Sequence, residues 1–430
     1  MGRRYLNCVV LVKASVIRGL FLFLYDIIMV LITNYMKQEL RQLLASKKDQ
    51  SVSVPVFFNL SQSEDQSRVH TLINEGKIQV TIDDYEELQL ELFGVHNPTK
   101  VYAPTFKQEF AEYYQSLEKS KPLHENGVWV YFPWSSKLVH ILHEDDFQLV
   151  RTARNMNLIS REEQKKYYNA CVAIGGLSVG SSVAFALVLQ GGPKHIKLAD
   201  MDRLALSNTN RILMGIDNLG ILKTEMAARR IYEINPYAHV ELFNDGLHPD
   251  NIDEFFKGVD IMIDELDNIA VKYLIREKAK QYKIPVLMGT DNGDNAVIDI
   301  ERYDTEENIT YFHGRMGDDI TYESLTTLDK FGIGKMATKC VGPENVTIKM
   351  QESLLEMGKT IVSWPQLGGA ALINGAAVAY CVRKILNDQL VENNRALFSL
   401  DEKLVPNYFS EEEIKKRADA ANTFKKIFGL

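Results

Sequence analysis

The pattern of apolar and polar positions becomes regular near residue 170, where short apolar runs begin to alternate with helical stretches. The predicted strands are CVAIG (171–175), HIKLAD (195–200), VELF (240–243), VDIMIDE (259–265) and PVLMGT (285–290), and the predicted helices cover 179–189, 223–234 and 271–282. Strands that alternate with helices usually form a parallel sheet covered on both faces. We therefore predict an α/β fold with a doubly wound, mostly parallel sheet.

The flanking regions have a different pattern. Residues 36–150 mix predicted strands with a helix over 106–117, which indicates an α+β accessory region. Residues 304–345 are polar and lack a clear period, so we predict a functional loop or a mobile lid there. Residues 391–430 are predicted to be a helical tail, because they end in the acidic and basic pattern SEEEIKKRADAANTFKK.

The first 35 residues contain two apolar stretches, at 9–14 and 19–33, as in a signal peptide or a membrane anchor. Three charged residues interrupt them, and each charge near the centre of a spanning helix costs about 2.5 to 3.5 kcal/mol. These residues are Lys13, Arg18 and Asp26. We therefore predict that the segment does not insert in a membrane. A second hypothesis is that Met36 is the true translation start.

Composition excludes few functions, but the use of cysteine indicates the cellular compartment. The chain has 430 residues and a net charge of -8, so it has no overall basic field that would favour nucleic acid as a partner. Its four cysteines form no CxxC pair, which argues against a zinc site and against a disulfide framework. This usage is typical of a reducing, cytoplasmic environment. The cysteines are Cys8, Cys171, Cys340 and Cys381.

A glycine turn follows the first predicted strand, at Gly175 to Gly180. Such a turn binds nucleotide phosphates when it leads into a helix. Leu177 stands where a dinucleotide-binding turn has its middle glycine, and a Cβ there would obstruct a pyrophosphate. Asp200 follows Gly180 by 20 residues, the spacing expected for a residue that binds a ribose hydroxyl, and Asp202 is an equally good candidate.

Polar residues further along the chain are suited to a triphosphate. Asn208 and Arg211, in the sequence SNTNR, can donate hydrogen bonds to phosphate oxygens. Lys223 opens a predicted helix, where its ammonium can neutralise charge on a departing pyrophosphate. Asp267 and Asn268 follow the strand VDIMIDE, and a carboxylate at that edge can hold Mg²⁺. The ordered set indicates activation of a carboxylate by ATP.

By these residues the chain resembles the ThiF/MoeB/HesA family, whose adenylating fold is shared with ubiquitin-activating enzymes. The resemblance covers roughly 154–304, with fainter similarity to about 386 that includes SWPQLGG at 363–369. It implies a Rossmann-like ATP-binding domain over 151–390 and an adenylyltransferase that forms an acyl-adenylate and pyrophosphate from Mg-ATP. The acid it implies is the C-terminus of a ubiquitin-like or sulfur-carrier protein. Threonylcarbamoyladenosine in tRNA is the alternative.

The resemblance also implies roles for individual residues. It assigns the ribose to Asp202, the phosphates to Asn208, Arg211, Lys223 and the turn glycines Gly175 and Gly180, and the magnesium ion to Asp267. Family members also insert an arginine into the ATP site of a partner subunit, which here would be Arg154, with Arg151 as second choice, in a homodimer. Two departures are Leu177 and Ser178 in place of glycines and the lack of the two CxxC pairs that hold zinc in many members, so no zinc is predicted.

Cys340 is a candidate thiol for accepting the acyl group from the adenylate. The neighbouring Lys339 is expected to lower the pKa of this thiol and raise its thiolate fraction. The alternative is an ordinary unreactive cysteine. Two other readings of the whole chain are an NAD(P)-binding oxidoreductase, supported by the glycine turn and Asp200, and a binding module without catalytic activity.

Overall fold

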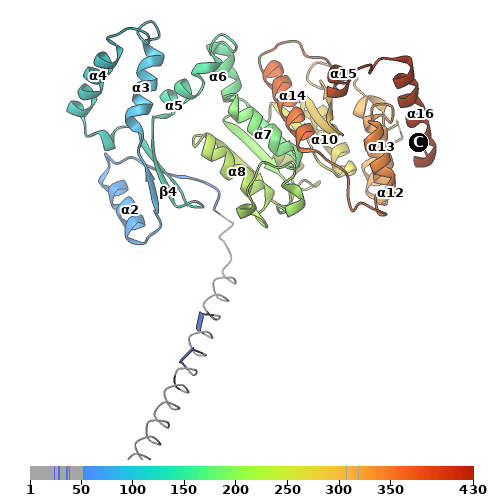
Figure 1. The fold of residues 1–430 in the computed structure, drawn as a ribbon, viewed down its shortest axis with the longest axis horizontal. Helices are drawn as coiled ribbons and strands as arrows, with labels where there is room; N and C mark the ends of the chain where they lie inside the picture. The colour runs from blue at the N-terminus through green and yellow to red at the C-terminus, as the bar shows by residue number, and fades with distance from the viewer. Residues whose placement is uncertain are drawn as a thin grey trace, which may run out of the picture. The chain divides into compact units, whose positions relative to one another are not determined.

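Apolar runs flanked by glycine or polar residues form the strands of a seven-stranded sheet in the computed structural model (Figure 1). The structure describes residues 52–430 except 307 and 318, and before them only positions 24, 28, 29, 35, 36 and 38. The predictions for residues 9–33 and for a start at Met36 therefore lie almost wholly outside the described residues. Residues 51–430 form one unit, separate from residues 1–50.

The large sheet has the strand order β11-β10-β9-β8-β5-β6-β7. β5, β6 and β7 run parallel to one another and to β8 and β9, whereas β10 and β11 are antiparallel to their neighbours. The prediction of a doubly wound, mostly parallel sheet is confirmed. The strands are β5 (Cys171–Gly175), β6 (His195–Ala199), β7 (His239–Phe243), β8 (Ile261–Asp264), β9 (Val286–Asn292), β10 (Asn295–Glu301) and β11 (Arg395–Phe398).

Helices cover both faces of this sheet (Figure 1). Alternate strand residues such as Ile174 and Ile263 pack under α7 (Val179–Leu189), α8 (Lys223–Ile234) and α14 (Gly368–Leu386). The intervening residues, including Ala173 and Met262, face α9 (Ile252–Phe256) and α10 (Ile269–Tyr282). Within the described residues α14 has the length and composition of a membrane-spanning helix, but it is a core helix that contacts α7, β9 and β10.

Residues 52–151 form an α+β region. Its sheet has the order β1-β3-β4-β2, and β3 and β4 form a hairpin around Ser136. Tyr237, between α8 and β7, donates a hydrogen bond of 2.7 Å to the carbonyl of Leu142, which ties this sheet to the large one. The elements are β1 (Val56–Phe58), α2 (Ser63–Asn74), β2 (Val80–Ile82), α3 (Tyr85–His96), α4 (Phe106–Ser120), β3 (Val128–Phe132), β4 (Lys137–Ile141) and α5 (Glu144–Arg151), followed by α6 (Arg161–Asn169).

Two predictions near the C-terminus were wrong. The segment 304–345 is not a loop without structure: it contains η5 (Tyr311–Gly314), α11 (Tyr322–Thr326) and α12 (Lys330–Val341). Thr321 and Asp329 cap the two α-helices, and Leu325 packs in a cluster with residues of α10. The tail 391–430 is not all helix, because it contributes the edge strand β11. The remaining helices are α13 (Ile348–Leu355), α15 (Leu400–Leu404) and α16 (Glu411–Phe428).

A buried ion cluster joins the two halves of the large sheet. Arg276 of α10 is fully buried, and its guanidinium pairs with Asp264 at the end of β8 and, over 2.9 Å, with Glu301 at the end of β10. The guanidinium also lies 4.0 Å from the ring centroid of Phe312. The Lys272 ammonium lies 3.1 Å from Asp264. Although burial opposes ionisation, Lys272 and Arg276 hold the pKa of Asp264 below its usual value.

We predict that Arg276→Met lowers the free energy of unfolding by about 3 to 5 kcal/mol, because it leaves two buried carboxylates without their partner. Urea denaturation followed by circular dichroism measures the change. Arg230→Met is the control, since Arg230 pairs with Glu233 over 3.2 Å at the surface and its loss should cost less than about 1 kcal/mol. Equal, small effects of the two changes would contradict a structural role for the buried cluster.

Candidate functional site

A cavity of about 700 Å³ opens where β5, β8 and β9 end. β6 and β7 lie on one side of β5, and β8 and β9 lie on the other, so the loops after β5 and β8 diverge and leave a crevice. Ligands of open parallel sheets bind at this kind of switch point. The polar residues that line the cavity include Ser178, Arg211, Glu265, Lys272, Asp267 and Asp291.

The glycine turn lies beside this cavity and depends on Gly176. This residue has φ +86°, and a Cβ there would lie 2.3 Å from the carbonyl oxygen of Glu265. Leu177 donates its backbone N–H to Asp200 over 2.7 Å, and its side chain is fully buried in the core. The Leu177 side chain packs in the core, and the expected obstruction of a pyrophosphate by its Cβ stays a prediction.

Gly175 and Gly180 lie at the two ends of the turn. Gly175 is the last residue of β5, and Gly180 lies in the first turn of α7. A Cβ on Gly180 would lie 3.0 Å from the Ile174 side chain, so a larger residue would push α7 away from β5. The close fit directs the N-terminus of α7 and its free N–H groups toward the crevice.

Asp200, Asp202 and Lys223 form a cluster next to the turn. The Lys223 ammonium lies 2.7 Å from Asp202 and 3.5 Å from Asp200. Asp200 is buried and accepts the backbone N–H groups of Leu177 and Asp202, and burial raises its pKa. The Asp202 side chain is 66% exposed. Asp200 thus organises the turn, while Asp202 is the carboxylate open to a ligand.

The sequence SNTNR places one cation at the cavity. Arg211 donates through Nε to the Ser178 hydroxyl over 2.8 Å, so it is attached to the glycine turn. Asn208 uses its side-chain oxygen to accept the N–H of Ala205 over 3.0 Å. Asn210 donates to the carbonyl of Gln366 over 2.8 Å, which joins this loop to the segment SWPQLGG.

β8 ends at Asp264, and Asp267 and Asn268 follow it in the loop before α10. Asp267 is exposed and lines the cavity. Asn268 caps α10 by accepting the N–H groups of Ala270 and Val271 over 3.0 and 3.2 Å. In this loop, the Asp267 carboxylate therefore offers the oxygens that a metal ion would bind.

Sequence reasoning missed two acidic residues of the cavity. Asp291 of β9 accepts hydrogen bonds from Asn374 over 2.6 Å and from Gln366 over 3.4 Å, and burial raises its pKa to about 6. Glu265 accepts the N–H of Gly289 over 2.7 Å, and burial raises its pKa well above the usual value. Asp291 follows the predicted strand PVLMGT, so its position at a strand end was the available signal.

Arg154 lies away from the cavity of its own chain. Its neighbour Asn155 donates to the carbonyl of Gln190, at the C-terminal end of α7. The glycine turn is at the other end of this helix, which has 11 residues and is about 16 Å long. Arg154 is exposed, whereas Arg151 donates to the carbonyl of Val188 over 2.7 Å. Of the two arginines, Arg154 is the one open to another subunit.

The expected lowering of the Cys340 pKa is wrong, while its role as an acyl acceptor stays a prediction. The thiol lines the cavity but is buried in α12, and burial raises its pKa to about 11. Lys339 is exposed and does not offset this effect. A thiol with such a pKa is almost entirely protonated at neutral pH and is a poor nucleophile.

Comparison with known proteins shows which proteins this chain is similar to. Residues 152–309 match the model of the ThiF family. An uncharacterised protein of Mycobacterium tuberculosis is 35% identical over 324 residues, which is 74% of this chain and 45% of that protein. The tRNA threonylcarbamoyladenosine dehydratase of Escherichia coli is 37% identical over 130 residues, 30% of this chain and 47% of that protein. A sulfur carrier protein adenylyltransferase of Thermus thermophilus is 25% identical over 173 residues, 40% of this chain and 62% of that protein.

A crystal structure of the Escherichia coli dehydratase is also similar, with a TM-score of 0.41 and 21% identity over 58% of this chain and 98% of that one. This chain spans about half the length of the first two curated relatives. The matched residues contain the glycine turn, the Asp200–Lys223 cluster, Arg211 and Asp267. Residues 152–309 are therefore similar to the ThiF family.

Proposed function

We propose that the protein uses ATP to adenylate a carboxylate. The observation that carries this proposal is the convergence of the glycine turn, Arg211 and Asp267 on one cavity at the switch point of the sheet. Relatives named adenylyltransferases support the same chemistry. In this reaction a carboxylate oxygen forms a bond to the α-phosphorus of ATP, the bond to the β-phosphate oxygen breaks, and pyrophosphate leaves.

The chain's own groups bind and orient the triphosphate. The N–H groups at the start of α7 and the Arg211 guanidinium donate hydrogen bonds to phosphate oxygens. The Asp202 carboxylate accepts a hydrogen bond from a ribose hydroxyl. Lys223 stabilises charge on the departing pyrophosphate once phosphate competes with Asp202 for its ammonium. Since these groups are fixed by the turn and by α8, the proposed acceleration comes from positioning and electrostatic stabilisation.

Asp267 and Asp291 would hold Mg²⁺. Both carboxylates line the cavity, and magnesium prefers oxygen ligands from one or two carboxylates together with phosphates. When bound, the ion would neutralise phosphate charge.

The acid substrate is proposed to be an extended protein tail. A second cavity of about 1120 Å³ shares Arg211, Trp364 and Gln366 with the first, so a long groove leads to the proposed nucleotide site. The C-terminus of a ubiquitin-like or sulfur-carrier protein would fit such a groove. The dehydratase relative favours threonylcarbamoyladenosine in tRNA as the second candidate.

We predict that the natural chain catalyses exchange of labelled pyrophosphate into ATP when the correct acid is added, and that Asp267→Ala and Lys223→Ala abolish this exchange. The exposed residues Asp250 and Lys257 provide matched controls, so Asp250→Ala and Lys257→Ala should keep full exchange. Because Lys223 is buried, thermal unfolding checks that its variant still folds. Undiminished exchange in both site variants would remove the proposed roles. If NAD, and not Mg-ATP, stabilises the natural chain against thermal unfolding, the result would favour an oxidoreductase.

We also predict that the active form is a homodimer in which Arg154 completes the site of its partner. Arg154→Ala and Asp267→Ala should each be inactive alone. A refolded mixture should recover roughly a quarter of the natural exchange rate, because half of the dimers are mixed and each has one intact site. A mixture that stays inactive, while analytical ultracentrifugation shows mixed dimers, would contradict a shared site.

A third prediction concerns the acyl acceptor. At pH 7.5 iodoacetamide should alkylate Cys340 of the folded protein slowly, at a rate similar to that of Cys381, since burial raises the pKa of both thiols to about 11. Because only the thiolate reacts, the rate should rise with pH up to about 11. Peptide mass spectrometry measures both rates. Selective, rapid labelling of Cys340 at neutral pH would restore it as a thioester candidate.

A further inference from the structure

The cavity at the switch point of the sheet has two chemically different ends. Its polar end contains Ser178, Arg211 and Asp267, where the proposed function places the phosphates and a magnesium ion. Its other end is formed by three helices near the C-terminus, α12, α13 and α16 (Figure 1). We call this part the apolar end, because it is lined by Phe331, Ile333, Gly334, Ala337, Leu354 and Phe428.

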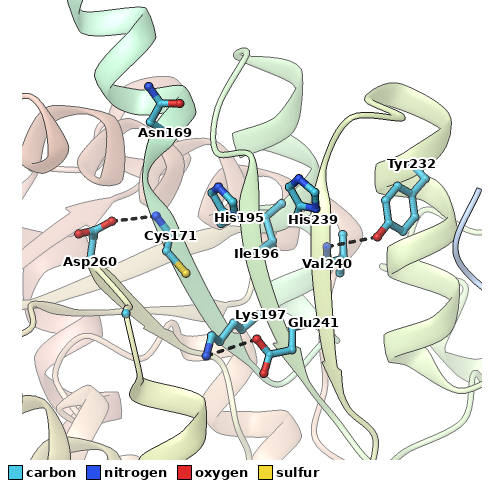
Figure 2. Close-up of a pocket in the computed structure, with 11 residues that line it drawn as sticks. Asn169, Cys171, His195, Ile196, Lys197, Tyr232, His239, Val240, Glu241 and Asp260 are labelled. Atoms are coloured by element: carbon cyan, nitrogen blue, oxygen red, sulfur yellow. Dashed lines mark hydrogen bonds and ion pairs between the residues drawn. The ribbon is translucent and has the colours of Figure 1, made fainter. Parts of the chain in front are cut away.

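The hollow at the opposite edge of the sheet, of about 440 Å³, has a different character (Figure 2). It is lined mainly by polar side chains, several of which pair with one another or with the backbone. Lys197 lies 3.4 Å from Glu241, and Asp260 accepts the backbone N–H of Cys171 over 2.8 Å. An apolar group would therefore bind at the apolar end of the larger cavity in preference to this hollow.

A bound nucleotide would leave the apolar end empty. In the sheet order β9-β8-β5-β6, the glycine turn follows β5 and the proposed ribose ligand Asp202 follows β6. Met288 of β9 lines the cavity on the other side of the turn and packs in one cluster with Ala337 of α12. A nucleotide with its ribose at Asp202 and its phosphates at the turn therefore extends away from the apolar end. That end remains available to the second substrate, the acid.

One face of α12 forms a wall of the apolar end. Along this helix the cavity-lining residues Phe331, Gly334, Ala337 and Val341 recur at intervals of three or four residues, so they lie on one side. Phe331 is 56% exposed, and Ile427 of α16, which lines the same cavity, is 59% exposed. Apolar side chains that gather in a cavity and stay exposed indicate a site for an apolar ligand.

Two hydrophobic clusters border the cavity at this end. Met288 and Cys340 belong to a cluster with residues of α10, whereas Val341 and Leu354 belong to a cluster with residues of α13 and α16. All four residues line the cavity. An apolar group bound at the apolar end would contact both clusters and lose its exposure to water, which would stabilise the complex through the hydrophobic effect.

Gly334 keeps part of this space open. It lies within α12, where glycine is less favourable than alanine. A Cβ at this position would meet no atom nearer than 3.8 Å, the distance to the Phe428 ring. No neighbouring atom therefore requires a glycine here, and its lack of a side chain leaves room for a ligand.

We propose that the acid activated by this protein carries a large apolar group, aromatic or branched aliphatic, close to its carboxylate, and that this group binds at the apolar end. The inference rests on the proposed function, in which the carboxylate meets the α-phosphorus beside the glycine turn and Arg211. Two kinds of acid have this chemistry: a protein tail that ends in a large apolar residue, and a free aryl or alkyl acid. The carboxylate of threonylcarbamoyladenosine adjoins a small hydroxyl-bearing side chain, which would leave the apolar end unfilled.

The test is pyrophosphate exchange by the full chain with Mg-ATP and two matched pairs of acids. One pair is the peptides N-acetyl-Gly-Gly-Phe and N-acetyl-Gly-Gly-Gly, and the other is 3-phenylpropionate and propionate. In one pair we expect kcat/KM to be at least about tenfold higher for the acid that bears the phenyl group, because the apolar end removes this group from water. A preference between the peptides identifies a protein tail, and a preference between the free acids identifies a small molecule.

Gly334→Leu tests where the apolar group binds. The leucine side chain would occupy the apolar end, so the ratio of kcat/KM within the discriminated pair should fall at least about fivefold. Gly94→Leu is the matched control, because Gly94 lies within α3 and a Cβ there would also make ordinary contacts, 3.7 Å from Phe106 and Val101. The control should keep the natural ratio. A ratio that Gly334→Leu leaves unchanged would contradict binding at the apolar end.

Binding without catalysis separates this inference from the adenylation proposal. Ligand-observed NMR titration of the full chain without ATP measures the dissociation constants of the four acids. If no acid supports exchange but a phenyl-bearing acid binds at least about tenfold more tightly than its match, and Gly334→Leu removes this difference, adenylation fails and the apolar end stands as an acid site. Equal binding within both pairs would overturn the inference, while exchange with equal kcat/KM within both pairs would overturn it and leave adenylation intact.

Discussion

The buried pairing of Arg276 with Asp264 and Glu301 is the constraint on which the rest of the structure depends. Asp264 ends β8, Glu301 ends β10, and Arg276 belongs to the helix between β8 and β9, so one guanidinium connects the parallel and antiparallel parts of the sheet. A charge buried so deeply is tolerated only when it is fully paired. The pairing therefore holds the end of β8, just before the loop with Asp267, against α10 and β10.

The proposed nucleotide site is built by contacts between loops that are distant in sequence. Gly176 lets the turn after β5 touch the chain at Glu265, Arg211 donates to the Ser178 hydroxyl, and Asn210 donates to the carbonyl of Gln366. These contacts join the turn, the loop after β6, the end of β8 and the segment before α14. Because each loop is anchored to a strand end or a helix start, the polar groups are held in place before a ligand arrives.

A parallel sheet offers two chemically different edges. At the carboxyl edge the loops lead into helix N-termini, whose N–H groups favour anions such as phosphates. At the amino edge of the same strands, Cys171, His195 and His239 lie in register on three successive strands.

The sequence alone determined the period of strands and helices, the glycine turn and the order of the polar residues, because these depend on hydrogen bonds and side-chain spacing between near neighbours. The limits of α7 and α8 agree with the predicted ranges 179–189 and 223–234 for this reason. Only the tertiary structure decided burial and pairing between distant segments. Tertiary packing buried the Leu177 side chain in the core, raised the pKa of the Cys340 thiol by burial, and brought Asp291 to the cavity. Pairing between distant strands placed β11 beside β10 and aligned His195 with Cys171 and His239. Such features depend on contacts between residues far apart in the chain, which no local pattern encodes.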